Sequence, residues 1–342
     1  MRSTVARCLC AGVLALIAIF VFPPVANATD SPQEEAQRQL TQPGNNAPVW
    51  REIRSGEPQT TTVQGVETGV LIQSNGQSWR ALRPYIASTG GLLLALVVGV
   101  LAVFYRWRGP IGLEGRLTRR LIERFDTIDR VLHWIMGLSF AALAISGLLL
   151  SFGKFLLLPL LGYTLFAWLA MLAKNVHNFT GPVFLLSLPF FIVRYVRDNL
   201  PRLCDIDWML KFGGMLSRQH VPSGRFNAGE KTLFWGLVCF LSVAVAASGL
   251  VLDFPNFGQG RSVMQLANVV HVTAALLAIA AALFHVYLGT VGVEGAYEAM
   301  RYGYVDETWA REHHELWYHD VRSGKARQHR VDGSGQPAHN LR

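Results

Sequence analysis

The sequence predicts an all-α membrane protein, a transmembrane helical bundle with five predicted spans. Of its 342 residues, 51% are hydrophobic and only 16% are charged, whereas soluble domains carry about 25% charged residues. The mean hydropathy is positive, at +0.28. Five apolar stretches approach or exceed the length of helix, about 20 residues, that crosses a hydrocarbon core. This composition excludes a disordered chain and argues against an ordinary soluble enzyme.

The first 28 residues have the form of a secretory signal peptide. Arg2 and Arg7 precede an apolar run over residues 9–22, and the A-N-A sequence at residues 26–28 matches a cleavage site. An uncleaved signal anchor is the alternative. Residues 29–85 are polar, and we expect them to form a periplasmic arm, in which residues 63–79 could make a β-hairpin.

The charges of the loops indicate in which direction each span crosses the membrane. We expect spans at residues 89–105, 131–152, 178–193, 232–252 and 263–293. With the mature N-terminus outside, the arginine clusters that follow the first, third and fifth spans all fall in the cytoplasm, as the positive-inside rule requires. A further apolar run at residues 155–173 would invert this order if it crossed the membrane. We therefore interpret it as an interfacial or re-entrant element on the outer face.

The chain then divides into six segments. After the signal peptide (1–28) and the arm (29–85) come the first transmembrane segment (86–107), a cytoplasmic linker (108–128), a four-helix bundle (129–295) and a cytoplasmic tail (296–342). The formal net charge of +8 is explained by cytoplasmic loops, so we expect no nucleic-acid partner. Cys204 and Cys239 match no zinc or iron–sulfur spacing.

Four histidines lie within the spans or at their ends: His133, His177, His271 and His285. An ionisable residue inside a membrane is a functional hypothesis by default, although any one of these could be a satisfied hydrogen-bonding residue. His271 and His285 are 14 residues apart, which places them on one helix face, about 21 Å apart along the axis. The span directions put His177 and His271 at the outer level, and His133 and His285 at the inner level.

Two imidazoles that face each other across a helical bundle are what a b-type haem with two axial histidines requires. The sequence therefore predicts two haem b groups, whose iron is bound by the four histidines, in a di-haem cytochrome b bundle of four helices. Zinc would require three or four ligands at one level. A proton-coupled membrane transporter, a function of a different class, would usually carry Asp or Glu in its spans, and the predicted spans contain none.

A faint repeat relates the second and fourth spans. Trp134 is followed by S-G-L at residues 146–148, and Trp235 is followed by S-G-L at residues 248–250. This pattern hints at repeated helix architecture. Some glycines of the spans could let a flat macrocycle approach, or could simply allow close helix packing; they are Gly137, Gly147, Gly181, Gly236 and Gly249.

Three motifs resemble the gamma subunit of respiratory formate dehydrogenase, a di-haem cytochrome b anchored in the bacterial inner membrane. They are FDTIDRVLHW at residues 125–134, FNAGEK at residues 226–231 and WAREHHELWY at residues 309–318. The resemblance covers about residues 121–321, with the motifs and the four histidines in matching order. The arm and the first span correspond only to the longer versions of this subunit.

The resemblance implies that the chain is the electron-transfer and anchoring part of a formate dehydrogenase complex, not its formate-oxidising subunit. Electrons would pass from a periplasmic molybdenum or tungsten catalytic subunit, through an iron–sulfur subunit, to the outer haem. The inner haem would then reduce menaquinone or ubiquinone near the cytoplasmic face of the inner membrane. The alternative in the same class is the cytochrome b subunit of a nickel–iron hydrogenase or a thiosulfate reductase.

The resemblance also assigns a quinone contact to Asn227 and Gly229, beside the inner-haem ligand His285. Asn227 offers an amide donor, and Gly229 offers a backbone N–H that can be approached closely. Asn227 could equally be only a helix N-cap. In the tail motif, we expect His313 and His314 to be solvated or to face a partner, and we assign them no haem.

Overall fold

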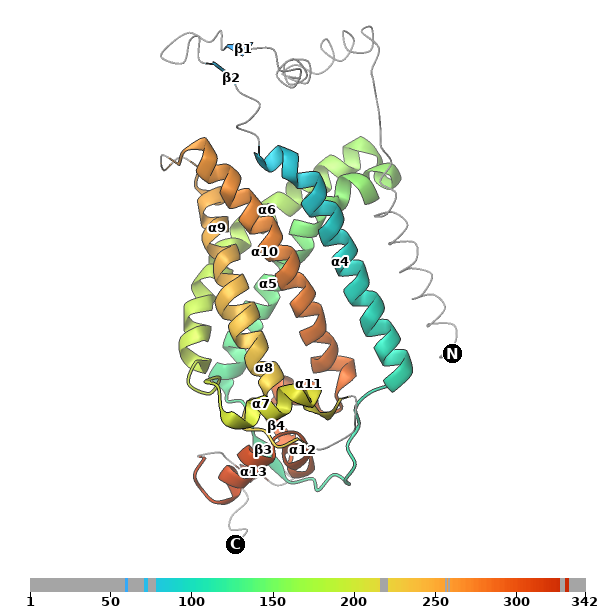
Figure 1. Ribbon diagram of the computed structural model, residues 1–342, viewed down its shortest axis with the longest axis vertical. Coiled ribbons are helices and arrows are strands. Elements are labelled where there is room, and N and C mark those ends of the chain that lie inside the picture. Colours follow the sequence, from blue (N-terminus) through green and yellow to red (C-terminus); the bar gives the residue numbers. More distant parts are fainter. Residues whose placement is uncertain are drawn as a thin grey trace.

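The computed structural model describes residues 59–60, 71–72, 78–215, 221–255, 257, 259–326 and 330–331. The signal peptide and most of the arm lie outside these residues. Five long helical segments run side by side (Figure 1), and each is long and apolar enough to cross a membrane. They are α4 (Ser78–Arg108), α5 (Thr127–Leu156), α6 (Leu158–Tyr195), the continuous segment of α8 (Ala228–Leu233), η3 (Phe234–Ser242) and α9 (Val243–Asp253), and α10 (Arg261–Tyr287). The predicted fold class is confirmed.

Two of these helices begin before the apolar runs that predicted them, because polar residues cap them. Asp126 precedes α5, and its side chain accepts a hydrogen bond from the backbone N–H of Asp129 at 2.7 Å. Asn227 precedes α8 and accepts from the N–H of Glu230 at 2.9 Å. In both cases the carboxylate three residues on accepts from the backbone N–H of the cap, which completes a capping box.

The apolar run at residues 155–173, which we expected to be an interfacial or re-entrant element, forms no separate candidate span among the described residues. It is divided between the end of α5 and the first half of α6, whose backbone leaves the helical conformation at Gly162 (φ 72°, ψ 172°). Beyond this break, residues 163–195 form about 50 Å of helix, more than the hydrocarbon core of about 30 Å. The second part of the run therefore continues into the span that α6 forms, and the described residues contain five candidate spans.

The helices pack as two hairpins with a fifth helix beside them. α5 packs on α6, α9 packs on α10, and α4 lies along α10 (Figure 1). Gly90 of α4 permits this last contact, since a Cβ there would overlap the side chain of Leu276. By contrast, neither α5 nor α6 packs closely against α10.

The bundle has two distinct ends. The arm end is where α4 and α10 begin, and the tail end is where residues 296–326 lie (Figure 1). The tail end carries a small antiparallel sheet in the order β4-β3-β5. Its strands are β3 (Leu121–Glu123), β4 (Tyr304–Asp306) and β5 (Arg330–Val331), and short helical segments surround it: α7 (Leu203–Leu210), η2 (Phe212–Gly214), η4 (Leu288–Gly292), α11 (Ala296–Tyr302), α12 (Glu307–His313) and α13 (Glu315–Arg322).

Two short strands precede the bundle. β1 (Gln59–Thr60) pairs antiparallel with β2 (Leu71–Ile72). The hairpin that we expected within residues 63–79 is thus present, but its first strand lies just before that range.

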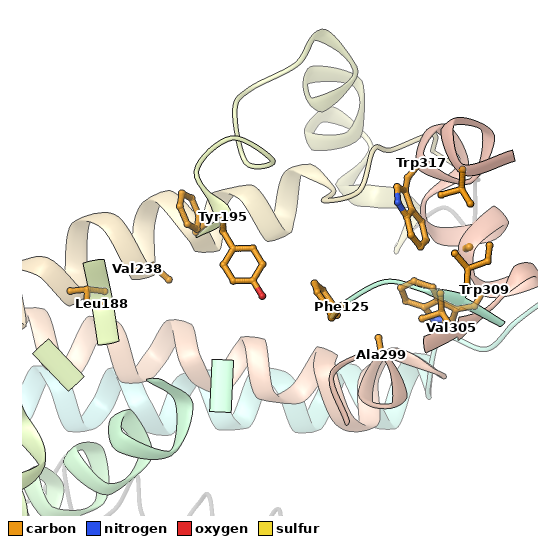
Figure 2. Close-up of a cluster of buried hydrophobic side chains, with 12 residues drawn as sticks. Phe125, Leu188, Tyr195, Val238, Ala299, Val305, Trp309 and Trp317 are labelled. Atoms are coloured by element: carbon orange, nitrogen blue, oxygen red, sulfur yellow. The ribbon is translucent and has the colours of Figure 1, made fainter. Parts of the chain in front are cut away.

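The three motifs singled out in the sequence meet at the tail end around one buried cation. The guanidinium of Arg124 is 2% exposed, and its Nη2 donates to a carboxylate oxygen of Glu230 at 2.9 Å. Its central carbon lies 4.9–5.8 Å from the centres of four aromatic rings, those of Phe125, Phe226, Trp309 and Trp317. Such desolvated cation–π contacts contribute on the order of 2 kcal/mol each. Figure 2 shows Phe125, Trp309 and Trp317 in this cluster.

A second buried charge joins three segments at the same end. Asp129 of α5 is 1% exposed and accepts from Nε of Arg194 on α6 at 2.6 Å and from Nη2 of Arg225 at 3.1 Å. Only Asp129 is buried in these pairs, and without the two partly exposed arginines its charge would be left uncompensated. Asp129 therefore fixes the angle at which α5, α6 and the segment before α8 meet.

His314 contradicts the expectation of a solvated or partner-facing tail histidine. It is 1% exposed, and its Nδ1 lies 2.7 Å from the carbonyl oxygen of Gly224. Because a carbonyl only accepts, Nδ1–H is the donor. His313 is half-buried next to the ring of Trp309. The tail motif is thus part of the core, because its two tryptophans pack around Arg124.

The docking of the tail should depend on pH through His314. Burial and the nearby Arg124 charge lower the pKa of His314 well below its ordinary value. The docked form therefore binds fewer protons than the undocked form, and docking should weaken as the pH falls below about 6.5. We predict faster hydrogen exchange in residues 307–322 at about pH 5.5 than at about pH 7.5, after correction for intrinsic rates.

Two matched variants separate the pH dependence caused by His314 from any caused by the neighbouring Glu230 carboxylate. His314→Asn keeps a donor towards Gly224 but does not titrate, so it should flatten the pH dependence. His319→Asn, at an exposed position of the same tail, should leave the pH dependence unchanged. Equal protection of the native tail at both pH values would contradict this account.

Candidate functional site

The four membrane histidines lie as two pairs at two depths of the bundle. The ring centres of His177 and His271 are 6.1 Å apart, and those of His133 and His285 are also 6.1 Å apart. We call these the arm-end pair and the tail-end pair. The unbroken helix α10 supplies one member of each, about 21 Å apart along its axis.

This separation suits a metal ion placed between the rings. Because a metal binds an imidazole nitrogen at about 2 Å, and that nitrogen lies about 1 Å from the ring centre, two axial imidazoles have ring centres about 6 Å apart. The helices that carry each pair, α5 with α10 and α6 with α10, do not pack closely against each other. Their separation leaves room for a macrocycle around the line that joins the two rings.

In the arm-end pair, a serine of the neighbouring helix contacts each imidazole. The hydroxyl oxygen of Ser146 lies 2.9 Å from Nδ1 of His177, and that of Ser248 lies 3.2 Å from Nδ1 of His271. Each hydroxyl also donates to the carbonyl four residues earlier in its own helix, at 2.7 Å for Ser146 and 2.5 Å for Ser248. Since each hydroxyl has one proton, its oxygen is left to accept from the imidazole.

The tautomer of the arm-end imidazoles follows from these contacts. Nδ1 of His271 lies 3.0 Å from the carbonyl oxygen of Val245, which can only accept. The proton of His271 is therefore on Nδ1, and the same assignment satisfies His177 and Ser146. The lone pair of Nε2, the other ring nitrogen, is then free to bind a metal.

Two glycines allow the imidazoles to lie this close to the helix backbone. A Cβ at Gly147 would be 3.2 Å from Cε1 of His177, and a Cβ at Gly249 would be 3.1 Å from Cε1 of His271. Both glycines directly follow the serines just described. The faint S-G-L repeat of the sequence thus corresponds to two copies of one histidine-binding arrangement. The sequence contained this signal, but its meaning depends on which histidine lies opposite each repeat.

Small residues lie four positions after every one of the four histidines. They are Gly137, Gly181, Ala275 and Gly289. In a helix, positions i and i+4 share a face, so these residues lie beside the imidazoles. A Cβ at any of the three glycines would meet no other atom within 4 Å. The faces beside the rings are therefore open, as a bound macrocycle requires.

The tail-end pair has a different environment. Nδ1 of His133 is buried without a hydrogen-bond partner in the described part of the chain. The side chain of His285 is exposed, although its ring faces His133 across the bundle. A ring that is accessible inside the bundle, as that of His285 is, fits a site whose occupant is not part of the polypeptide.

The two residues assigned to a quinone lie at the tail end. Asn227 is the N-cap of α8, so its side-chain oxygen is already used by Glu230. Gly229 makes room for an indole, because a Cβ there would be 2.7 Å from the ring of Trp208. Its backbone N–H is one of the first-turn donors that have no partner within a helix. His133 follows the Asp126 cap of α5 by seven residues, or about 10 Å along the axis.

The chain is similar in sequence to cytochrome b556 subunits of formate dehydrogenases. The chain is 33% identical over 208 residues to the formate dehydrogenase cytochrome b556(fdo) subunit of Escherichia coli K12, which covers 60% of this chain and 95% of that relative. It is 29% identical over 219 residues to the nitrate-inducible cytochrome b556(Fdn) subunit of the same organism, covering 63% and 98%. It is 27% identical over 210 residues to the formate dehydrogenase cytochrome b556 subunit of Haemophilus influenzae, covering 58% and 83%.

The matched region contains all four histidines. The family model of prokaryotic cytochrome b561 matches residues 124–303, slightly more than half of the chain. This region begins at Arg124 and ends after α11, and it leaves out α4, which precedes it. The chain belongs to the prokaryotic cytochrome b561 family, a family of helical bundles whose cytochrome b character implies haem b.

Proposed function

We propose that the chain is the membrane cytochrome b subunit of a formate dehydrogenase complex, with two haem b groups through which electrons cross the membrane to a quinone. The observation that carries this proposal is the pair of facing imidazoles, 6.1 Å between ring centres, repeated at two depths. The names of the relatives favour formate dehydrogenase over a nickel–iron hydrogenase or thiosulfate reductase. The transporter alternative has no use for two such pairs.

The histidines bind and orient the cofactors. His177 and His271 would hold one haem at the arm end, and His133 and His285 would hold the other at the tail end. Haem iron with two axial histidines takes up and releases single electrons. The two ligand levels on α10, about 21 Å apart, span most of a hydrocarbon core about 30 Å thick. The protein thus provides two electron sites that together cross the membrane.

The positions of the arginines support the orientation. Arg106 and Arg108 end α4, and Arg194 ends α6, so these charges lie at the tail end. By the positive-inside rule, the tail end faces the cytoplasm and the arm end faces the periplasm. The iron–sulfur subunit would then contact the arm end and receive electrons from a periplasmic molybdenum or tungsten subunit. This chain takes no direct part in formate oxidation.

The quinone would be reduced at the tail end, beside His285. The Asn227 amide would donate to one quinone carbonyl, and the free first-turn N–H of Gly229 is a second donor. Protons for the reduced quinone would then come from the cytoplasm. Because formate releases protons on the other side, turnover would build up a membrane potential.

The two roles of Asn227, as helix cap and as hydrogen-bond donor to the quinone, can be separated by substitution in the complex assembled with its catalytic and iron–sulfur subunits. Asn227→Asp keeps an oxygen that can cap α8, but its carboxylate has no hydrogen-bond donor for the quinone. We predict that quinone reduction by formate falls about tenfold or more, while formate still reduces both haems. Asn227→Ser keeps both a capping oxygen and a hydroxyl donor, so its quinone reduction should fall less.

The opposite result would restrict Asn227 to capping. If Asn227→Asp reduces quinone at the native rate while Asn227→Ala is impaired, only the N-cap matters. Loss of formate-driven haem reduction in Asn227→Asp would place the residue before the quinone in the electron path, against the proposal.

The open faces beside the rings give a second test. In the polypeptide alone, Gly137→Ala and Gly181→Ala meet no neighbour and should stabilise their helices by up to about 1 kcal/mol. With haem bound, the added methyl groups would contact the macrocycles. We predict a lower haem-to-protein ratio, with Gly137→Ala affecting the tail-end haem and Gly181→Ala the arm-end haem. Undiminished haem content in both variants, measured as pyridine haemochrome, would show that no macrocycle lies there.

A further inference from the structure

We propose that Ser146 and Ser248 are positioning residues, which keep Nδ1–H of both arm-end ligands bonded to oxygen and so set the reduction potential of the arm-end haem below that of the tail-end haem. This inference rests on the proposed two-haem function. It assigns to the S-G-L repeat a role in tuning one cofactor relative to the other.

The first step is that both serines have fixed hydroxyls. Ser146 contacts the carbonyl oxygens of Ala142 and Leu143 at 2.7 and 3.2 Å. Ser248 contacts those of Ala244 and Val245 at 2.5 and 3.2 Å. The same offsets, four and three residues earlier, occur in two helices from different hairpins. Each hydroxyl is therefore anchored to its own backbone and presents its oxygen lone pair to the neighbouring helix.

The second step is that each arm-end imidazole ring is held with its Nδ1–H towards an oxygen atom. Gly147 and Gly249 bring Cε1 of each ring against the helix that carries the serine. For His271 a carbonyl from the same turn supplements the serine, since the oxygen of Val245 lies 3.0 Å from Nδ1. Both rings are thus held with Nδ1–H pointing at oxygen atoms and Nε2 pointing away.

The third step concerns the electron density of the ligand. A metal-bound histidine that donates its other ring N–H to oxygen becomes more basic and a stronger electron donor. Stronger donation stabilises ferric over ferrous iron and lowers the reduction potential. Both axial ligands of the arm-end haem have this hydrogen bond.

The tail-end pair lacks the arrangement. Nδ1 of His133 is buried and has no acceptor among the described residues. At least one ligand of the tail-end haem therefore donates less electron density to the iron than the arm-end ligands do. The reduction potential of the tail-end haem should accordingly be higher than that of the arm-end haem. Electrons then flow downhill from the arm end to the tail end, the direction that the proposed function requires.

Spectroelectrochemical titration of the purified chain tests the inference. His271→Ala identifies the arm-end haem by its loss. In the Ser146→Ala, Ser248→Ala double variant, the potential of the arm-end haem should rise by about 59 mV, a tenfold change in its one-electron equilibrium, and that of the tail-end haem should stay constant. Each single variant should shift the same potential in the same direction by less, because one serine and the carbonyl of Val245 remain.

Two controls separate tuning from general structural damage. Ser187→Ala removes a buried serine of α6 whose hydroxyl, within the described part of the chain, bonds only the carbonyl of Phe184, and it should shift neither potential. Ser146→Thr retains the hydroxyl and should keep the native potential. In addition, the loss of the serine hydrogen bonds to His177 and His271 in the double variant should change the low-spin electron paramagnetic resonance spectrum of the arm-end haem alone.

The failures of the two proposals are distinguishable. If the one-electron equilibrium of the arm-end haem changes by less than twofold in the double variant, or if its reduction potential falls, the serines do not have the proposed role. An equal shift of both haems would overturn it as well. A native chain without two haems would instead contradict the proposed function.

Discussion

The whole arrangement depends on one constraint: two imidazoles must lie on the same face of α10, at two depths, each opposite a histidine of another helix. The fourteen-residue spacing of His271 and His285 satisfies this in one unbroken helix. The partners, His133 and His177, come from the two helices of a hairpin that runs in opposite directions. If α10 were kinked or rotated, both pairs would be lost together, because they share this one helix.

Two buried charges at the tail end fix the helices that carry these rings. Asp129 ties α5 to α6 through Arg194, and Arg124 ties the start of α5 to α8 through Glu230. The tail motif covers the Arg124 contact with two tryptophans, so the buried charge is shielded from water. The buried charges beside and within the three sequence motifs thus have a structural role, while the four histidines lie deeper in the bundle.

Much of this could be predicted from the sequence, because apolar length and intramembrane histidines are strong signals. The five spans and the depths of the four histidines follow from residue spacing alone. The break of α6 at Gly162 could not be predicted, because hydropathy does not register the backbone conformation of one residue. The burial of His314 depends on long-range packing in a polar segment, and the role of Ser146 and Ser248 depends on which helices become neighbours.

The most direct test of the account is the number and ligation of haems in the purified native chain. Pyridine haemochrome with protein quantification should give two haem b per chain, and the oxidised protein should show two low-spin ferric signals typical of two axial histidines. His285→Ala should remove one signal and leave the other. One haem or none in well-folded protein, or a high-spin ferric centre, would contradict the claim that two pairs of facing imidazoles are the functional core of this protein.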